Sequence, residues 1–183
     1  MASTIRVDTL QDAGANEYFA SDGSGVFSGA LTMKPSFRVT LSGDQTGIPD
    51  TTTTLITFDT NSGSVSAGEC WDTNSAWDTS TYRFTVPAGE AGKYQFNWAT
   101  YVQTLDKDER MVQKLYLNGS STNYGEVQWQ SNRSSGAANG TGTVTLELSV
   151  ADYVDLRIWV NAGTTTTLPV ARCFLCGYKM VGI

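Results

Sequence analysis

Two cysteines separated by two residues, Cys173 and Cys176, are the first residues in this sequence that could do chemistry. Their spacing is found in redox-active pairs and in halves of metal sites. A tetrahedral metal site needs further Cys or His ligands, yet the chain has no histidine and only one other cysteine, Cys70. On a strand, residues three apart point to opposite faces. We therefore expect Cys173 and Cys176 to be small buried residues, and Cys70 to be a packing or loop residue.

Carboxylates form the second candidate site, in a stretch that also contains Lys107 and Arg110. Asp106, Asp108 and Glu109 lie within four residues of one another. Loops with several carboxylates bind Ca²⁺ or contact receptors, because hard cations prefer several oxygen ligands. The neighbouring cations also suit a solvated loop whose charges balance, and this interpretation is the one we adopt. We expect no cofactor, and whether calcium binds stays open at this point.

Enzymatic chemistry has little support in the sequence. The absence of histidine removes the commonest general base and every His-dependent triad. No Gly-x-Ser-x-Gly elbow is present. A glycosidase with two carboxylates depends on spatial pairing, and the sequence selects no pair. We therefore predict that the protein is not an enzyme.

Charge and hydropathy limit the partners. The 183 residues contain 12 Lys and Arg against 18 Asp and Glu, a net charge of −6. A negative protein repels phosphate, so we expect no nucleic-acid partner. Apolar runs are only a few residues long, and residues 1–8 lack the apolar core of a secretory signal. We expect no membrane insertion and synthesis in a cytoplasm.

Strands with one buried face are predicted along most of the chain, because apolar and polar residues alternate from Phe37 onward. The expected strands are residues 37–41, 51–58, 82–86, 93–99, 112–117, 125–130, 143–148, 153–160 and 170–180. Asn118-Gly119 predicts a tight hairpin, and the Ser-, Asn- and Gly-rich stretch 131–142 predicts a loop. Eight or nine strands without a helix predict an all-β antiparallel sandwich or barrel. Spacing alone leaves the jelly roll, the immunoglobulin-like sandwich and the closed barrel open.

Large aromatic residues gather on one predicted strand. Tyr94, Phe96 and Trp98 share a face, and Tyr101 follows them. We take these four residues as a candidate aromatic face that either fills the core or meets another copy of the chain. Buried aromatic rings of this size stabilise cores and interfaces alike.

The first 35 residues differ from the rest of the chain. Their apolar residues fall in strand pieces that are too short to bury a face alone: Ile5, Val7, Leu10, Tyr18 and Phe19. Such pieces need a partner surface. We therefore divide the chain into an N-terminal attachment or trimerisation segment, residues 1–35, and a head domain, residues 36–183.

Loops of a sandwich cluster at its ends, where such folds bind partners. Besides the carboxylate loop, the polar loops offer Asn132, Arg133 and Thr165 as candidate binding residues. Their hydroxyl, amide and guanidinium groups could contact a sugar or a host protein.

The order of motifs over residues 37–183 resembles the globular complement 1q domain, a branch of the tumour-necrosis-factor-like jelly rolls. The resemblance is carried by Phe58-Asp59, residues 77–87, residues 92–96, residues 115–119, residues 146–154 and residues 174–180. It implies an antiparallel jelly-roll head and a homotrimer. The sequence departs from the family at Val150-Ala151, where glycine is usual, and at Cys176, where serine is usual.

Residues 3–16 resemble the opening of many bacteriophage tail-fibre and appendage proteins. Together with the head, this resemblance implies a non-enzymatic virion protein, located in the virion. Its partners would be other copies of itself, other virion proteins through the N-terminal segment, and a host-surface glycan or protein. Its task would be host adhesion or appendage assembly. A capsid decoration or cement protein, and a stand-alone carbohydrate-binding module, remain as alternatives.

Overall fold

Strands make up nearly all of the regular structure of this chain. The computed structural model describes residues 9–11, 17–20, 35–65, 68–132 and 136–180. Its strands are β1 (Thr9–Gln11), β2 (Glu17–Ala20), β3 (Ser36–Thr40), β4 (Gln45–Ile48), β5 (Thr54–Leu55), β6 (Gly63–Val65), β7 (Gly68–Asp72), β8 (Trp77–Asp78), β9 (Arg83–Thr85), β10 (Gly92–Val102), β11 (Arg110–Leu117), β12 (Ser120–Gln130), β13 (Ala138–Leu148), β14 (Tyr153–Asn161), β15 (Thr166–Leu168) and β16 (Phe174–Lys179). A single 3₁₀ turn, η1 (Val170–Arg172), is the only helical element in these ranges.

The chain divides into two units, Met1–Thr32 and Met33–Ile183. In the first unit, β1 pairs antiparallel with β2, and Leu10 lies opposite Phe19. Ile5 and Val7, which the sequence suggests for attachment, lie outside the described residues. The second unit contains the head domain expected over residues 36–183, and that domain is called the head below.

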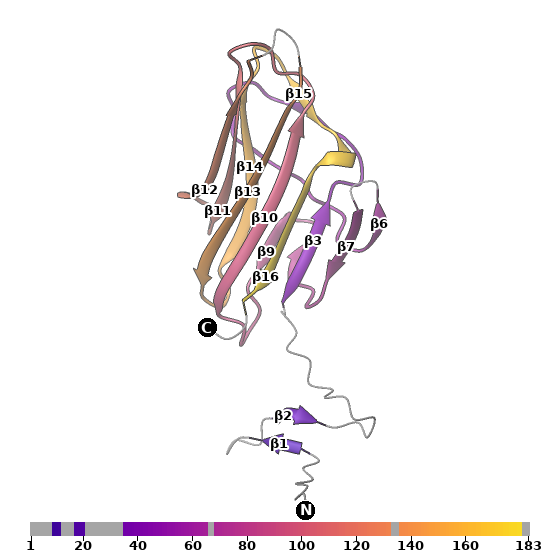
Figure 1. The fold of residues 1–183 in the computed structure, drawn as a ribbon, viewed down its shortest axis with the longest axis vertical. Coiled ribbons are helices and arrows are strands. Elements are labelled where there is room, and N and C mark those ends of the chain that lie inside the picture. Colours follow the sequence, from indigo (N-terminus) through magenta and orange to yellow (C-terminus); the bar gives the residue numbers. More distant parts are fainter. Residues whose placement is uncertain (1–8, 12–16, 21–34, 66–67, 133–135, 181–183) are drawn as a thin grey trace, which may run out of the picture. The chain divides into compact units, whose positions relative to one another are not determined.

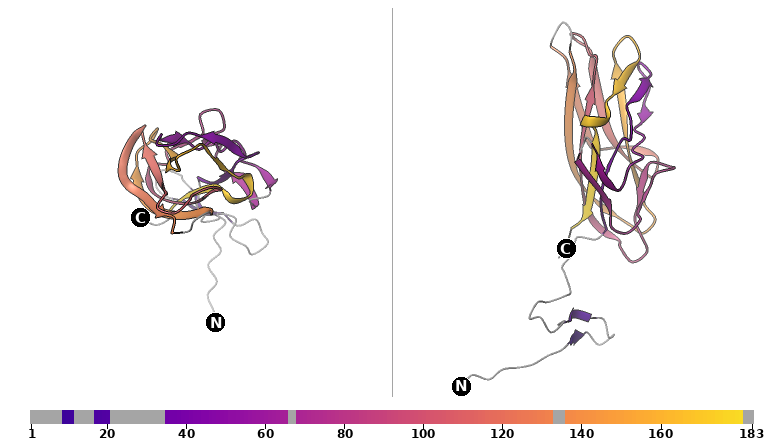
Figure 2. Two further views of the ribbon diagram at one scale, coloured as in Figure 1. Left: turned by 90° about the horizontal axis from the view of Figure 1, so that it is seen from above. Right: turned by 90° about the vertical axis from the view of Figure 1, so that its right-hand side faces the viewer.

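Two antiparallel sheets face each other in the head (Figures 1 and 2). The strand order of one sheet is β13-β10-β16-β3-β7-β6, and that of the other is β12-β11-β14-β9-β8, with β5 paired to β14. We call these the β10 sheet and the β11 sheet. A short pair, β15-β4, stands apart from both. Several strands have only two or three residues, which explains why the sequence predicted fewer of them.

Alternation along the strands separates core from surface as the sequence predicts. Phe37, Val39 and Leu41 are all buried, and so are Tyr94, Phe96 and Trp98. Aromatic rings fill one part of the core: Phe84 stacks on Phe37 with ring centroids 5.0 Å apart. Stacked and edge-on rings of this kind add to the stabilisation from burial.

The predicted hairpin at Asn118-Gly119 is present between β11 and β12. Both residues have positive φ, 52° and 73°, as a two-residue type I′ turn requires. The Asn118 side chain also accepts a hydrogen bond from the Tyr153 amide at 2.9 Å and donates one to Asp152 at 2.8 Å. This turn therefore ties two connections together at one end of the head.

A buried polar contact joins the two sheets beyond the aromatic cluster. The indole N–H of Trp98, on β10, donates to Oε1 of Gln113, on β11, at 2.7 Å. The Gln113 amide N–H donates in turn to Oγ1 of Thr100 at 2.5 Å. All three residues are buried. Because an unpaired buried donor is costly, this network specifies how the sheets face each other.

Glycines on β13 make room for that network. Gly142 pairs with Trp98 in register, and Gly140 pairs with Thr100. A Cβ at Gly142 would collide with the Trp98 ring, and one at Gly140 would collide with the Gln113 amide. From the facing sheet, a Cβ at Gly125 would lie 2.9 Å from Cη2 of Trp98. Glycine is thus required here for close approach.

The predicted loop over residues 131–142 is too long. Strand β13 begins at Ala138 and pairs with β10 along its length. Glycine-rich composition suggested a flexible connection, but Gly140 and Gly142 serve a closely packed strand. A glycine that packs against a large side chain cannot be told from a loop glycine by composition alone.

Replacing Gly142 by alanine tests the glycine cradle around Trp98. We expect Gly142→Ala to lower the free energy of unfolding by about 1–3 kcal/mol, because the new methyl group overpacks against the indole. The measurement is urea unfolding followed by tryptophan fluorescence. Gly43→Ala is the matched control, since a Cβ there meets nothing within 4 Å, and it should be near neutral. Equal stability of the two variants would contradict this packing.

Candidate functional site

Cys173 is buried as the sequence predicts, whereas Cys176 is not fully buried, which corrects that part of the prediction. Cys173 is fully buried, and Cys176 is half-buried on the outward side of β16. Cys70 is also buried, with its sulfur 3.2 Å from Oγ1 of Thr40. All three thiols are free. Desolvation raises the pKa of Cys173 to about 11 and also raises the pKa of Cys176, so neither thiol is activated for nucleophilic chemistry.

The carboxylate loop folds on itself. The Asp106 amide donates to a Glu109 carboxylate oxygen at 2.6 Å, and Asp108 has a positive φ of 70°. Within the described ranges, no three His, Cys, Asp or Glu side chains are grouped so that they could hold a metal ion. The same ranges contain no helix of sufficient length and apolarity for a membrane span.

The predicted binding loops meet at one end of the head. The Asp108 amide donates to the Ser131 carbonyl at 2.9 Å, and the Leu105 amide donates to the Gly136 carbonyl at 2.8 Å. The Gln103 amide reaches the Thr167 carbonyl, near exposed Thr165. The loops that carry Asp106, Asp108, Glu109, Asn132 and Thr165 are therefore brought together, whereas Arg133 lies outside the described residues.

The chain enters the head at the end opposite the candidate loops. The Lys179 amide donates to the Pro35 carbonyl at 3.0 Å, beside the start of β10, where the Met180 amide donates to the Lys93 carbonyl. The candidate loops follow the opposite end of β10, after Val102. The chain thus enters the head at one end and presents its polar loops at the other (Figure 1).

Tyr101 does not share the face of Tyr94, Phe96 and Trp98, which corrects the predicted aromatic face. Strand β10 continues without a break to Val102, so alternation turns Tyr101 outward while the other three rings point into the core. Tyr101 is half-buried, with the guanidinium of Arg172 4.5 Å from its ring centroid. The core face and the outward face of β10 are therefore separate surfaces.

The outward residues of β10, β13 and β16 are uncharged near the centre of the sheet, although the guanidinium of Arg38, on the adjacent strand β3, lies 4.1 Å from the Phe174 ring centroid. We call the outward side of β10, β13 and β16 the uncharged face, and its members are Gln95, Asn97, Ala99, Tyr101, Asn139, Thr141, Thr143, Thr145, Phe174, Cys176 and Tyr178. A hollow of about 350 Å³ on this face is lined by Asn97, Thr143 and Phe174 among others. The Tyr178 hydroxyl donates a hydrogen bond to the Gln95 side chain at 2.8 Å. Some polar groups of the uncharged face are therefore paired with each other.

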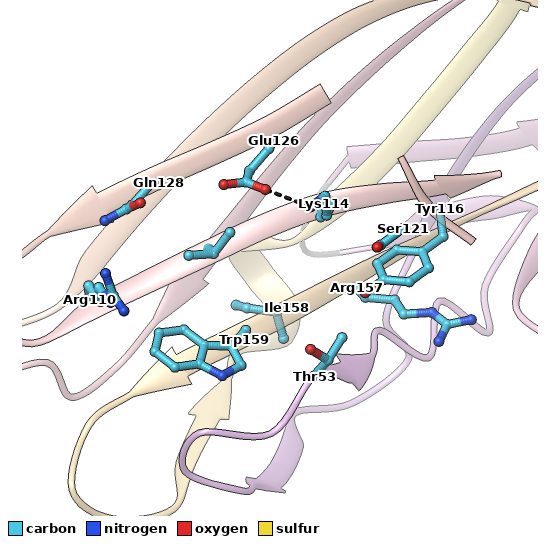
Figure 3. A pocket seen from close by; sticks show the side chains of 11 residues that line it. Thr53, Arg110, Lys114, Tyr116, Ser121, Glu126, Gln128, Arg157, Ile158 and Trp159 are labelled. Atoms are coloured by element: carbon cyan, nitrogen blue, oxygen red, sulfur yellow. Dashed lines mark ion pairs between the residues drawn. The ribbon is translucent and has the colours of Figure 1, made fainter. Parts of the chain in front are cut away.

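The outward side of the β11 sheet, in contrast, carries several charged side chains. A groove of about 320 Å³ runs over β11, β12 and β14, and Figure 3 shows the side chains that line it. We call it the cationic groove, after its charged and aromatic members Arg110, Lys114, Tyr116, Glu126, Arg157 and Trp159. Thr53, Ser121 and Gln128 add polar groups.

Two of the groove's cations rest on aromatic rings. The guanidinium carbon of Arg157 is 4.2 Å from the Tyr116 ring centroid, and that of Arg110 is 5.0 Å from the Trp159 ring centroid. Nε of Arg157 also donates to buried Asp155 at 2.7 Å, and this hydrogen bond is the main cause of the raised pKa of Arg157. Tyr116 and Asp155 together fix the position of the Arg157 charge, and Trp159 alone fixes that of Arg110.

The remaining groove cation is paired at the surface. Nζ of Lys114 lies 2.7 Å from Oε2 of Glu126, whose side chain is 40% exposed. The Lys114 side chain is only 19% exposed, so water competes for this pair mainly at Glu126. Arg110 forms no ion pair with any residue that the structure describes. Sequence reasoning missed this groove, because register across three strands brings its members together.

No protein-family model and no curated protein matches this sequence. Among solved structures, the head is similar to the globular domain of the zebrafish complement 1qA protein, with a TM-score of 0.55 and 17% identity. The match covers 82% of this chain and 100% of that one. The fold is that of the complement 1q globular domain. This confirms the jelly-roll sandwich that the order of sequence motifs predicts.

Thiol labelling tests the inert character of Cys173. With a pKa of about 11, roughly one thiol in a thousand is ionised at pH 8. Burial adds a steric barrier, so we expect iodoacetamide at pH 8 to leave Cys173 unlabelled in the native protein, as read by peptide mass spectrometry. The same chain unfolded in guanidinium chloride is the control and should be labelled at all three cysteines. Rapid native labelling of Cys173 would contradict its assignment as a core residue.

Proposed function

We propose that this protein is a non-enzymatic bacteriophage virion subunit. In this proposal, its complement 1q-like head recognises a host-surface molecule, and its N-terminal segment joins it to other virion proteins. The observation that carries the proposal is that the two ends of the head differ. The chain enters at one end, beside Pro35 and Lys179, and the polar loops around Asp106 and Ser131 lie at the other end. An appendage head needs this arrangement, because its attachment and its contact surface must point in opposite directions.

The N-terminal segment supports attachment to a particle. Its described residues form a two-stranded antiparallel pair, β1 and β2. A two-stranded pair is marginal in water without a partner surface. The residues around it also resemble the opening of phage fibre proteins. We therefore assign virion attachment, or contact with other copies, to residues 1–35.

Trimer formation through the uncharged face is the second part of the proposal. Between Gln95 and Tyr101 on β10, and between Phe174 and Tyr178 on β16, every outward residue is uncharged. Depletion of charge together with aromatic side chains is typical of interface centres, whereas free surfaces are rich in charge. Three copies related by a threefold axis would cover this face and close the assembly.

The mass of the native assembly tests the trimer. Light scattering at micromolar concentration should give three times the 19.7 kDa chain mass. Thr143 is exposed and lines the hollow on the uncharged face, so Thr143→Arg should shift the protein to monomers by placing like charges around the threefold axis. The matched control is Val150→Arg, an exposed loop position, which should remain trimeric.

A wild-type monomer at this concentration would contradict the trimer. A trimer that persists in Thr143→Arg would contradict the chosen face while keeping the assembly. Electron microscopy of antibody-labelled particles tests the virion role separately. We expect label at a tail or appendage, whereas label on the capsid facets would favour a decoration protein.

A further inference from the structure

We propose that the cationic groove binds an acidic saccharide through Arg110, Lys114 and Arg157. The ligand is a sugar chain that carries carboxylates, such as one built from uronic acids. This inference rests on the proposed recognition function and assigns it a site and a ligand class. It places recognition on the outward side of the β11 sheet, in a groove whose Arg110 end adjoins the end loop that carries Glu109.

Charge complementarity is the first argument. The whole chain has a net charge of −6, yet the groove is lined by three cations, which face the Glu126 carboxylate and the Asp155 carboxylate paired with Arg157, so one positive charge is left in excess. Such a local reversal of sign on an acidic protein focuses an attractive field on small anions. The overall negative charge continues to repel a large polyanion such as nucleic acid.

Arg110 is the principal anchor. Trp159 holds its guanidinium by one face, 5.0 Å from the ring centroid, and no described carboxylate pairs with it. A guanidinium stacked in this way keeps its N–H edges free for two parallel hydrogen bonds to a carboxylate. Because the ring limits the side chain's freedom beforehand, less conformational entropy is lost when a ligand binds.

Lys114 and Arg157 supply secondary contacts. Glu126 is the more exposed member of its pair with Lys114, so a ligand carboxylate can replace it beside the ammonium group. Arg157 uses Nε and Nη2 on Asp155, which leaves Nη1 for a ligand. As Figure 3 shows, Arg110 with Trp159 and Arg157 with Tyr116 flank the two ends of the groove, and Lys114 lies between them.

The polar members of the groove favour a saccharide over an acidic peptide. Thr53, Ser121 and Gln128 offer hydroxyl and amide groups that can donate and accept hydrogen bonds, as sugar hydroxyls require. A volume of about 320 Å³ lies at the small end of ligand pockets and suits a sugar unit. An acidic peptide is the competing occupant and is included in the test.

Calorimetry on the full chain tests the site with matched probes. Oligogalacturonate should bind, and its methyl ester, which keeps the hydroxyls but loses the charge, should bind at least about tenfold more weakly. Binding should weaken as salt increases, because the contacts are exposed. Oligoglutamate of equal length should also bind more weakly than oligogalacturonate.

Two variants localise the binding. Arg110→Gln should weaken oligogalacturonate binding about tenfold or more, whereas Arg83→Gln should stay within about twofold. Arg83 is a matched control because it also stacks on a ring, that of Tyr153 at 4.3 Å, and does not line the groove. Thermal melting confirms that both variants are folded.

Absence of binding, equal binding of the methyl ester, equal binding of oligoglutamate, or equal losses in both variants would each overturn the inference. Light scattering on the same samples separates this result from the proposed function. A trimer without saccharide binding would overturn the groove alone. A monomer that binds oligogalacturonate through Arg110 would keep the groove and overturn the trimer.

Discussion

The hydrogen bond between the Trp98 indole and the Gln113 side chain is the contact on which the two-sheet arrangement depends. A tryptophan inside a sandwich must find an acceptor for its N–H. Here the acceptor is on the facing sheet, and its own amide is satisfied by Thr100 on the first. The pair therefore fixes how one sheet lies over the other. A shift of one sheet relative to the other would leave several buried polar groups without hydrogen-bond partners at once.

The glycines follow from this contact. An indole this close to the neighbouring strand leaves no space for side chains at Gly142 or Gly125. Further along the core, Gly177 meets the rings of Phe96 and Phe37 in the same way, where a Cβ would lie 2.7 Å and 2.8 Å from their nearest ring carbons. Large rings placed opposite glycines fill the interior without voids, as a densely packed core requires.

An interior fixed in this way leaves the outward positions free to differ. Part of β10, β13 and β16 forms the uncharged face, and the β11 sheet has a cationic groove, although both are built on the same alternation. The end loops form a third surface, joined by backbone hydrogen bonds between the segments around Asp108 and Ser131. The jelly roll therefore serves as a scaffold whose separate surfaces can take separate roles, which is why fold alone does not fix function.

The sequence predicted what depends on local pattern. Alternation located the long strands and the buried side of β3 and β10, but the strand expected over residues 51–58 is only the two residues of β5. Asn118-Gly119 located the hairpin because that dipeptide tolerates two positive φ angles. The outward position of Tyr101 was missed, because the end of β10 was placed too early. The start of β13 was also missed. The need for glycine at position 140 becomes apparent only when the Gln113 side chain is seen to pack against it.

The cationic groove also could not be predicted from local sequence pattern. Arg110 and Trp159 are far apart in sequence, and only the antiparallel register of β11 with β14 brings their strands together. Long-range register of this kind is set by the packed interior. The candidate loops were easier to predict, because sandwich loops collect at the ends whatever the register.

A double-mutant cycle on Trp98 and Gln113 tests the inter-sheet contact most directly. Urea unfolding would give the stabilities of Trp98→Phe, Gln113→Leu and the double variant relative to the natural chain. We expect Gln113→Leu alone to cost about 1–3 kcal/mol, because it orphans the indole N–H. The double variant should be more stable than the sum of the single losses predicts, by at least about 1 kcal/mol. Losses that add within about 0.5 kcal/mol would contradict a coupled contact between the sheets.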